Sequence, residues 1–371
     1  MNPKLIRMFI FYSIVLFSCT EEKENPHLSV INIKNFETCI EFKYIEFVPR
    51  EIKISHSDSG YPIYIQDIKS RKTFKYNLTN DTILYKSLSE TKLSNYFFET
   101  FLKTDDSIYL LKLDTKNIGL LNRNGDVIRN YVIDTIYDPI IFPPADLEFK
   151  NNCFIIGNVS NSIGFGYKKD RFKYYETVRP ILLAKISDTK LHCLAIGKFP
   201  ENYITTGDNY KDNLPAACIG KDGNICVSFG ADNNLTLYHN SNQILKKEVK
   251  SKFIDKFIPY PDEKLFDMLY LKNYWAEEPK YTNIIFDPFV NMYYRVVKHR
   301  QNKSEKGNKL NTWSVIILDT DLNTLGEVRF NSEYRLGIFI PTPFGVILAK
   351  SNSKYCNKAI LSLIKIKKNE K

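Results

Sequence analysis

Short apolar runs separated by polar turns recur along the chain, and this pattern is typical of antiparallel β-strands. Residues 118–128, 235–245 and 314–325 each contain an apolar strand, a turn rich in Asn, Asp or Gly, and a second strand. These turn residues adopt the left-handed backbone conformation at low cost, so the chain can reverse direction there. Each of the three stretches therefore predicts a β-hairpin.

A further apolar run precedes each hairpin, within residues 106–111, 223–228 and 292–297. The unit is thus a meander of several strands, repeated at intervals of roughly 50 residues or more, which is the range of propeller blades. We predict an all-β fold, a six-bladed β-propeller of antiparallel meander blades. We expect an early strand near residues 51–54 to close the ring beside the last strand, around residues 361–364. A β-sandwich of two or three sheets is the alternative.

Residues 251–283 interrupt this rhythm and predict one short helical insertion. The apolar positions of residues 262–271 are spaced for one face of a helix, and Asp262 is the expected N-cap. A propeller does not need such an insertion to close its ring, and long loops on rigid scaffolds often carry function.

Aromatic residues are concentrated in and beside this insertion. Their rings offer apolar stacking area together with polar handles, which suits sugar or peptide ligands. The alternative is that the insertion caps the core and buries the rings. The candidate ligand-binding residues are Tyr260, Tyr270, Tyr274, Trp275 and Tyr281.

The N-terminus has the three parts of a secretory signal. Lys4 and Arg7 precede an apolar run at residues 8–17, and Ser18 supplies a small residue before cleavage. The apolar run is too short for a permanent transmembrane helix. We therefore expect a signal peptide at residues 1–18, a lipidated N-terminus and tether at residues 19–34, and a propeller domain at residues 35–371.

Leu16, Ser18 and Cys19 together resemble the lipobox of bacterial lipoproteins. The resemblance implies that the Cys19 thiol carries diacylglycerol, that the signal is cut before Cys19, and that the new amino group is acylated, which gives a stable membrane anchor. The acidic run at residues 20–25 looks like the export signal of surface lipoproteins of Bacteroidota. This implies an outer-membrane protein facing the cell exterior. A hydrophilic tether on the periplasmic face is the alternative.

The lipobox, the blade-like turns and residues 284–295 together resemble the TolB-like six-bladed propeller lipoproteins of Bacteroidota, a family without an assigned activity. The resemblance covers most of the mature chain. It implies a fold and a cellular address, and it brings no catalytic residues to carry over.

Composition agrees with this fold and narrows the choice of partners. Aromatic residues make up 14% of the chain, with 24 Tyr and 25 Phe, and they favour strands over helices. The formal net charge is +10, but Lys and Arg are scattered, whereas a nucleic-acid binder concentrates positive charge on one face or helix. We therefore expect a glycan, peptide or protein partner and no nucleic acid.

Neither a metal site nor a cofactor is predicted. The chain has 7 Cys, and neither a Cys-x-x-Cys pair nor a His-x-x-x-His pair is present. Cys218 and Cys226 flank a turn at Asp222 and Gly223 and could face each other across a hairpin, either as free thiols or as a disulfide.

Evidence for catalysis is weak. Ser187 and Lys190 match the Ser-x-x-Lys pattern of acyl-transfer enzymes, but that chemistry needs a helix and the segment predicts a turn. The leading hypothesis is a binding module without enzymatic activity. The alternative is a glycan hydrolase or lyase that uses a carboxylate pair. The candidate carboxylates are Asp138, Asp146, Asp262, Asp267, Glu277 and Glu278.

Overall fold

The structure is a computed structural model that covers strands in the first third of the chain and most residues after it. The residues that it describes are 28–41, 45–47, 61–67, 72–78, 83–90, 98–104, 107–112, 117–122, 126–134, 139–140, 149–150, 153–158, 168–187, 190–210, 215–301, 312–350 and 358–368.

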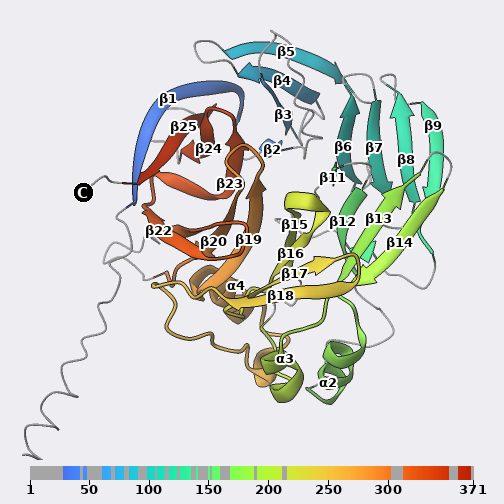
Figure 1. The fold of residues 1–371 in the computed structure, drawn as a ribbon, viewed down its shortest axis with the longest axis vertical. Helices are drawn as coiled ribbons and strands as arrows, with labels where there is room; N and C mark the ends of the chain where they lie inside the picture. The colour runs from blue at the N-terminus through green and yellow to red at the C-terminus, as the bar shows by residue number, and fades with distance from the viewer. Residues whose placement is uncertain are drawn as a thin grey trace, which may run out of the picture.

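The described strands form six sheets, and neighbouring strands within each sheet run antiparallel. The sheets follow one another around the molecule in chain order (Figure 1). The first two sheets contain β2 (Ile45–Phe47), β3 (Tyr61–Asp67), β4 (Lys72–Leu78) and β5 (Ile83–Glu90), then β6 (Phe98–Thr104), β7 (Ser107–Lys112), β8 (Asn117–Asn122) and β9 (Val127–Val132).

The next two sheets occupy the middle of the chain. They contain β10 (Pro139–Ile140), β11 (Phe149–Lys150), β12 (Cys153–Asn158), β13 (Ile181–Ile186) and β14 (Leu191–Ile196), then β15 (Ala216–Ile219), β16 (Ile225–Ser228), β17 (Asn234–His239) and β18 (Asn242–Glu248).

The last two sheets bring the two ends of the described chain together. They contain β19 (Lys280–Asp287), β20 (Met292–Lys298), β21 (Trp313–Leu318) and β22 (Thr324–Phe330), then β23 (Tyr334–Thr342), β24 (Gly345–Lys350), β25 (Lys358–Lys368) and the early strand β1 (Leu28–Glu41).

The structure confirms the three predicted hairpins. They are the antiparallel pairs β8–β9, β17–β18 and β21–β22, and the runs predicted before them are β7, β16 and β20. Asn240 takes the expected left-handed conformation in the second turn, with a φ of 55°. In the third turn the left-handed residue is Leu322, with a φ of 58°, because Asp319 and Asn323 bond each other across the loop.

Burial changes from the inner to the outer strands of a sheet. All six residues of β21 are buried, whereas β18, at the edge of its sheet, has no buried residue. A strand covered on both faces needs a continuous apolar run, and an edge strand with one solvated face tolerates charged residues. This difference explains why the apolar runs in the sequence mark the inner strands most clearly.

The closing pair involves an earlier part of the chain than predicted. β1 pairs with β25, with Phe36 opposite Leu361 and Asn32 opposite Ile364. The strand predicted at residues 51–54 lies outside the described residues. β1 begins at Leu28, so it runs across the expected boundary at residue 35 between tether and domain.

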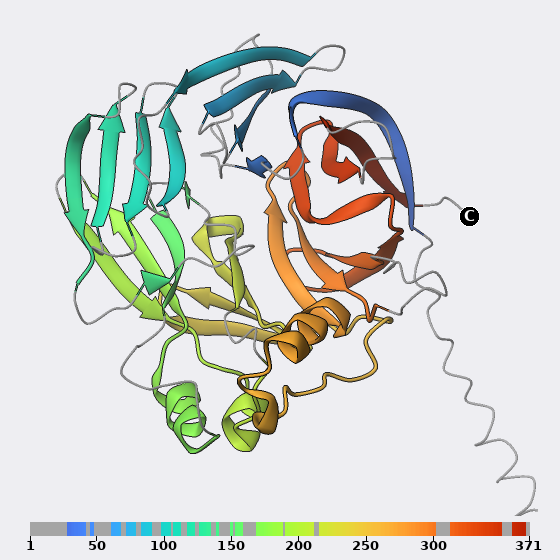
Figure 2. The same ribbon diagram turned by 180° about the vertical axis from the view of Figure 1, so that it is seen from behind.

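The prediction of a single helical insertion is wrong. The described residues contain three α-helices, α2 (Lys168–Thr177), α3 (Glu201–Thr206) and α4 (Met268–Glu277). Helices α2 and α3 lie together below the sheets in Figures 1 and 2, and α4 lies above them, beside β18. Two short 3₁₀ turns are also present, η2 (Lys221–Gly223) and η3 (Asp262–Lys264). Helix α2 lies between β12 and β13 of one sheet, and α3 precedes β15, the first strand of the next. Both helices have polar and aromatic sequences without a clear apolar periodicity.

Buried side chains form clusters that are each shared by two consecutive sheets. One cluster joins the β15–β18 sheet to the β19–β22 sheet, and another joins the β19–β22 sheet to the sheet that contains β1. A third joins the β6–β9 sheet to β13, and a fourth joins β12–β14 to β15–β17 beneath α2 and α3. The sheet of β10–β14, the β15–β18 sheet and the β19–β22 sheet thus each pack on the sheet before and on the sheet after.

Within the described residues, no helix combines the length and apolar character that crossing a bilayer requires.

Candidate binding pocket at the helical end of the sheets

The five candidate aromatic residues divide into two groups. Tyr260, Tyr274 and Tyr281 are buried, whereas Tyr270 and Trp275 are 37% and 46% exposed. The expectation that the rings are buried therefore holds for three of them. Of the five, Tyr274 and Trp275 line the pocket described next.

This pocket has a volume of about 320 Å³, including the space that is open to solvent. It lies between α4, the start of β19 and the loop that follows β16. Its walls are mostly apolar and aromatic, as in sites for small organic ligands. The lining residues are Tyr210, Gly230, Ala231, Phe257, Ile258, Tyr274, Trp275, Glu278, Pro279 and Lys280.

One side of α4 is fixed by three tyrosines in edge-to-face contact. The ring of Tyr260 contacts the rings of Tyr270 and Tyr274 edge to face, at 5.4 and 5.1 Å between centroids. The Tyr274 hydroxyl donates to the carbonyl oxygen of Ile258 at 2.7 Å. Aromatic pairs of this geometry stabilise a fold beyond their buried area. Tyr274 is therefore a wall of the pocket whose position is set by the fold.

The two ends of α4 are held by polar groups. At the first turn, the Asp267 carboxylate accepts from the Tyr270 amide at 2.9 Å, and this bond keeps the pKa of Asp267 below its usual value. At the last turn, Lys298 Nζ donates to the carbonyl oxygens of Trp275 and Glu278. A cation at this end also interacts favourably with the helix dipole. The backbone that carries Trp275 is thus fixed, although its indole is half-exposed.

Glu278 is engaged at the rim of the pocket. Its two carboxylate oxygens accept from the Arg300 guanidinium at 2.9 and 2.8 Å. The amide of Gln301 donates to the carbonyl oxygen of Glu277, next to Glu278, at 3.0 Å. These bonds join the end of α4 to the segment after β20.

The helix in the insertion begins later than predicted. Asp262 opens only the short turn η3, and Asp267 is the N-cap of α4. The carbonyl oxygen of Lys264 accepts from the Tyr260 hydroxyl at 2.5 Å and from the Asp267 amide at 2.9 Å, which closes a turn before α4. The Asp262 carboxylate instead contacts α2.

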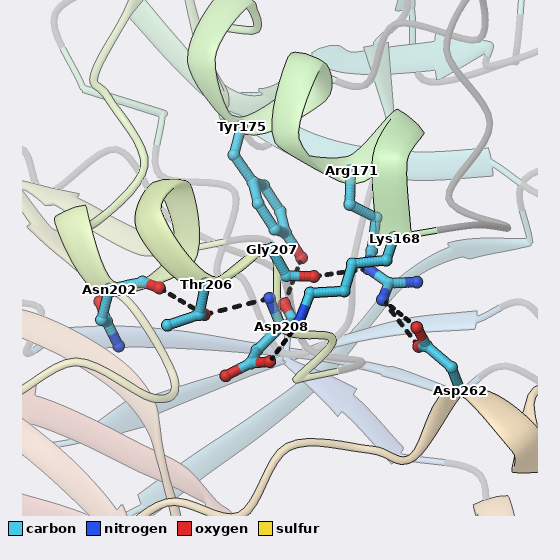
Figure 3. Close-up of polar contacts among 8 residues, drawn as sticks. All are labelled: Lys168, Arg171, Tyr175, Asn202, Thr206, Gly207, Asp208 and Asp262. Carbon is cyan, nitrogen blue, oxygen red and sulfur yellow. Dashed lines mark hydrogen bonds and ion pairs between the residues drawn. The ribbon is translucent and has the colours of Figure 1, made fainter.

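Arg171 links α2, on which it lies, to the end of α3 and to the turn η3 (Figure 3). Its guanidinium donates to both carboxylate oxygens of Asp262 at 2.7 Å and to the carbonyl oxygen of Gly207 at 2.9 Å. Nearby, the Tyr175 hydroxyl donates to the Asp208 carbonyl oxygen, and Lys168 lies 3.8 Å from the Asp208 carboxylate. The Arg171 side chain is almost fully buried, whereas that of Asp262 is partly exposed. This ion pair holds η3, and the loop before α4, against α2.

A buried arginine fixes the other wall of the pocket. Arg295 of β20 donates to the carbonyl oxygens of Asn233 and Val249 at 2.8 and 2.7 Å, and its guanidinium carbon lies 3.3 Å from the centre of the Tyr281 ring. Burial lowers the pKa of Arg295 to about 10, so it stays charged at neutral pH. The Tyr281 hydroxyl accepts from the Ser251 amide and contacts Asn233. The Tyr281 amide also donates to the carbonyl oxygen of Gly230, which lines the pocket, at 2.9 Å.

Three of the four candidate carboxylates within the described residues are engaged in structural contacts. Asp262 is bound by Arg171, Asp267 caps α4, and Glu278 is bound by Arg300. Asp138 and Asp146 lie outside the described residues. Ser187 and Lys190 exchange two backbone hydrogen bonds in the turn between β13 and β14, so they do not share a helix face.

His299, Ser314 and Glu327 lie together but in an order that does not suit nucleophilic catalysis. His299 Nε2 is 2.8 Å from Ser314 Oγ, which in turn donates to Glu327 Oε1 at 2.5 Å. A catalytic triad needs the acid on the histidine and an accessible serine. Here the acid binds the serine, and Ser314 is fully buried.

His299 is expected to make stability depend on pH. Burial, aided by the charge of Arg329, lowers its pKa to about 4. The unfolded chain therefore takes up this proton first as the pH falls below about 6.5, and stability is lost down to about pH 4. We expect a loss of about 2 kcal/mol between pH 7 and pH 4.5 from this residue, measured by urea unfolding. His299→Gln keeps a donor for Ser314 without titrating, so its profile should be flatter by that amount. Superimposable profiles would contradict the assignment.

Cys218 and Cys226 face each other across the β15–β16 hairpin, as predicted. Both are buried, and both are free thiols. Among the described residues, no group of three or more His, Cys, Asp or Glu side chains could hold a metal ion.

Sequence reasoning missed most of the pocket. Phe257 and Ile258 lie in the predicted insertion as an apolar pair before a proline, which was a usable signal. Arg295 was also visible as a single charge inside an apolar strand, a pattern that indicates a buried, fully bonded side chain. Nothing local marks Tyr210, Gly230 and Ala231, because they reach the pocket only through the packing of different sheets.

Comparison with known proteins identifies a family. Residues 94–329 match the family model described as "Domain of unknown function (DUF4221)". No curated protein matches the chain. A crystal structure of a member of the DUF4221 family from Bacteroides vulgatus is similar with a TM-score of 0.69 at 16% identity, over 94% of this chain and all of that one. At this identity the likeness shows the fold alone.

Other solved structures are less similar. A putative exported protein from Bacteroides fragilis has a TM-score of 0.45 at 10% identity, over 90% of this chain and 98% of that one. The aldose sugar dehydrogenase from Streptomyces coelicolor also has a TM-score of 0.45, at 11% identity, over 92% of this chain and 99% of that one. Likenesses at this level carry no activity over to this chain.

Proposed function

The chain belongs to the DUF4221 family, and from this premise we propose that it is a lipid-anchored, six-bladed β-propeller of the outer membrane that binds a ligand in the pocket beside Trp275. The domain faces the cell exterior, and the ligand is a glycan, a peptide or an exposed segment of a protein.

The order and packing of the sheets support the propeller. The six sheets follow the chain in order, and β1 completes the sheet of the last strands, β23, β24 and β25. Sheets that each pack on the sheets before and after them suit a radial arrangement, whereas a sandwich has two sheets packed face to face. Because β1 pairs with β25, the start and the end of the described chain share one sheet, as in a closed ring of blades.

The single observation that carries the binding function is that the backbone of Trp275 is fixed while its indole is half-exposed. Lys298 and the capped ends of α4 fix the backbone of Trp275, and Tyr274 packs behind it, yet the indole remains 46% exposed at the edge of an apolar pocket. A fixed, half-exposed indole loses little conformational entropy when a ligand stacks on it. Folding does not require this exposure.

The lipid anchor rests on the sequence alone. Leu16, Ser18 and Cys19 form a lipobox after a short apolar run, and an acidic run follows at residues 20–25. These residues precede the first described strand, β1.

Replacing Trp275 is expected to abolish binding without loss of stability. The probes are short oligosaccharides and short apolar peptides of defined sequence, and the readouts are calorimetry and indole fluorescence. The chain has only 2 Trp, and Trp313 is buried, so quenching reports mainly on Trp275. We expect saturable quenching by one class of probe, and no heat of binding with Trp275→Ala at an unchanged melting temperature.

Tyr274→Phe is the matched control at the neighbouring position. It removes the hydroxyl that bonds Ile258 but keeps the ring in the wall of the pocket. It should cost about 1 kcal/mol of stability and leave binding unchanged. Binding that survives in Trp275→Ala, or the absence of binding to every probe, would rule out this pocket as the site.

A further inference from the structure

The pocket beside Trp275 has walls rich in aromatic rings that the fold holds in place. The aromatic residues of its lining are Tyr210, Phe257, Tyr274 and Trp275. The first three each contact the ring of a further tyrosine, at 4.8, 5.7 and 5.1 Å between centroids. These supporting residues are, in the same order, Tyr203, Tyr281 and Tyr260. All three are buried, so most of the aromatic wall is fixed before a ligand arrives, which lowers the entropic cost of binding.

The polar backbone groups of the loop after β16 already have partners within the protein. The carbonyl oxygen of Gly230 accepts from the Tyr281 amide at 2.9 Å. The Ala231 amide donates to the Tyr203 hydroxyl at 3.1 Å, and the Ala231 carbonyl oxygen accepts from Asn202 Nδ2 at 3.2 Å. Two of the tyrosines that support the aromatic wall thus also bond the backbone of this loop.

The polar groups on the opposite side of the pocket are bonded in the same way. The carbonyl oxygen of Ile258 accepts from the Tyr274 hydroxyl at 2.7 Å, and Pro279 has no amide hydrogen to donate. The Glu278 carboxylate accepts from the Arg300 guanidinium at 2.9 and 2.8 Å. A cationic ligand would therefore have to displace Arg300 from Glu278.

The remaining charged residue of the lining is Lys280, and it is half-buried. Lysine side chains commonly cover apolar surface with their methylene groups while the ammonium group reaches water. The pocket therefore combines apolar walls with polar groups that are bonded to the protein itself. A sugar ring that enters it would exchange water for few new hydrogen bonds, and burial of unpaired hydroxyl groups is unfavourable.

An aromatic ring does not have this cost. It has no hydroxyl groups to desolvate, and it packs on other rings edge to face or with an offset, so several lining rings can contact it at once. An alkyl chain could fill the same space but would lack these preferred ring geometries.

We propose that the pocket binds an aromatic ring, which is supplied by a side chain of a polypeptide or by a free aromatic compound, and that it does not bind a sugar. This inference rests on the proposed binding function of the pocket, and it names the chemistry of the ligand.

Three glucosides that differ in one group test the inference on the full, unmodified chain. The probes are phenyl, hexyl and methyl β-D-glucoside, and the readouts are calorimetry and Trp275 fluorescence. We expect saturable binding of the phenyl compound, weaker binding of the hexyl compound, and no binding of the methyl compound at about tenfold higher concentration. Equal binding of the phenyl and methyl compounds, or of the phenyl and hexyl compounds, would overturn the inference.

Trp275→Ala separates this inference from the proposed function. If a methyl glycoside or an oligosaccharide binds to the wild type, and Trp275→Ala abolishes that binding, the pocket is the site but its ligand is a sugar, so the inference is wrong and the proposed function remains. If none of the probes binds, both are wrong.

The two sources of the ring are distinguished with N-acetyl-phenylalaninamide and benzyl alcohol. Tighter binding of the amide by about tenfold would assign the ring to a polypeptide, because the flanking amide groups then add contacts at the rim. Equal binding would assign it to a free aromatic compound. Either result supports an aromatic ligand, and failure of both compounds to bind would contradict it.

Ile258→Thr and Ile258→Val test whether the ring enters the pocket beyond Trp275. Both variants keep the backbone carbonyl that accepts from Tyr274, and both shorten the side chain, but only threonine adds a hydroxyl group to the wall. Ile258→Thr should weaken the binding of phenyl β-D-glucoside about fivefold relative to Ile258→Val, at similar melting temperatures. Equal affinities for the two variants would show that the ring does not contact this wall, and would overturn the inference.

Discussion

Arg295→Met is expected to lower the free energy of unfolding by about 3–5 kcal/mol, because several buried hydrogen-bond acceptors lose the guanidinium that donates to them. The guanidinium donates to the carbonyl oxygens of Asn233 and Val249 and to Ser228 Oγ, and it stacks on Tyr281. Methionine fills a similar length but donates nothing. Chemical denaturation of the two proteins at pH 7 measures the difference.

Arg295→Lys is the matched control, because it keeps the charge and loses the planar fork. It should lie between the wild type and Arg295→Met. Both variants should also weaken ligand binding, because Gly230 and Ala231 line the pocket on the loop before Asn233. A stability within about 1 kcal/mol of wild type for Arg295→Met would contradict this role.

Gly345→Ala is expected to cost at least about 3 kcal/mol, because the sheet that contains β1 leaves no room for the new methyl group. Gly345 has a φ of 140°, and a Cβ built there lies 2.2 Å from the carbonyl oxygen of Ile364. Ile364 belongs to β25, which pairs with β1 on its other side. Relief of the clash must therefore shift the strand on which the closing pair depends. Thermal and denaturant unfolding measure the loss.

Gly223→Ala separates this clash from the cost of backbone conformation. Gly223 also has a positive φ, 75°, but no atom lies within 4 Å of its built Cβ. We expect a loss of about 1 kcal/mol there, from the left-handed conformation alone. Equal losses at the two glycines would show that the contact with Ile364 is tolerated.

The meander of strands was predictable because it depends on local order. An apolar run, a turn of Asn, Asp or Gly and another run specify a hairpin whatever surrounds them, as β17–β18 and β21–β22 illustrate. The helices were less predictable. Helix α4 was expected at residues 262–271 and occupies Met268–Glu277, because Arg171, distant in sequence, draws Asp262 away from a capping role.

The candidate site was predictable only in part, for the same reason. The sequence marked the insertion and its aromatic residues, but it did not separate the rings that fill the core from the ring that faces solvent. Tyr274 and Trp275 are neighbours in the chain, and their exposure differs because consecutive helical residues point about 100° apart, so only one of them meets Tyr260.

The sequence by itself determined the strands, their hairpins and the residues available to an anchor at Cys19, because these depend on neighbours along the chain. Only the tertiary structure decided which strand closes the last sheet, which carboxylates are engaged, and where the pocket lies. These features depend on contacts between residues far apart in the chain, such as β1 with β25, Arg171 with Asp262 and Arg295 with the loop at Asn233. The local sequence is compatible with many such long-range contacts, and the packing of the assembled sheets determines which of them form.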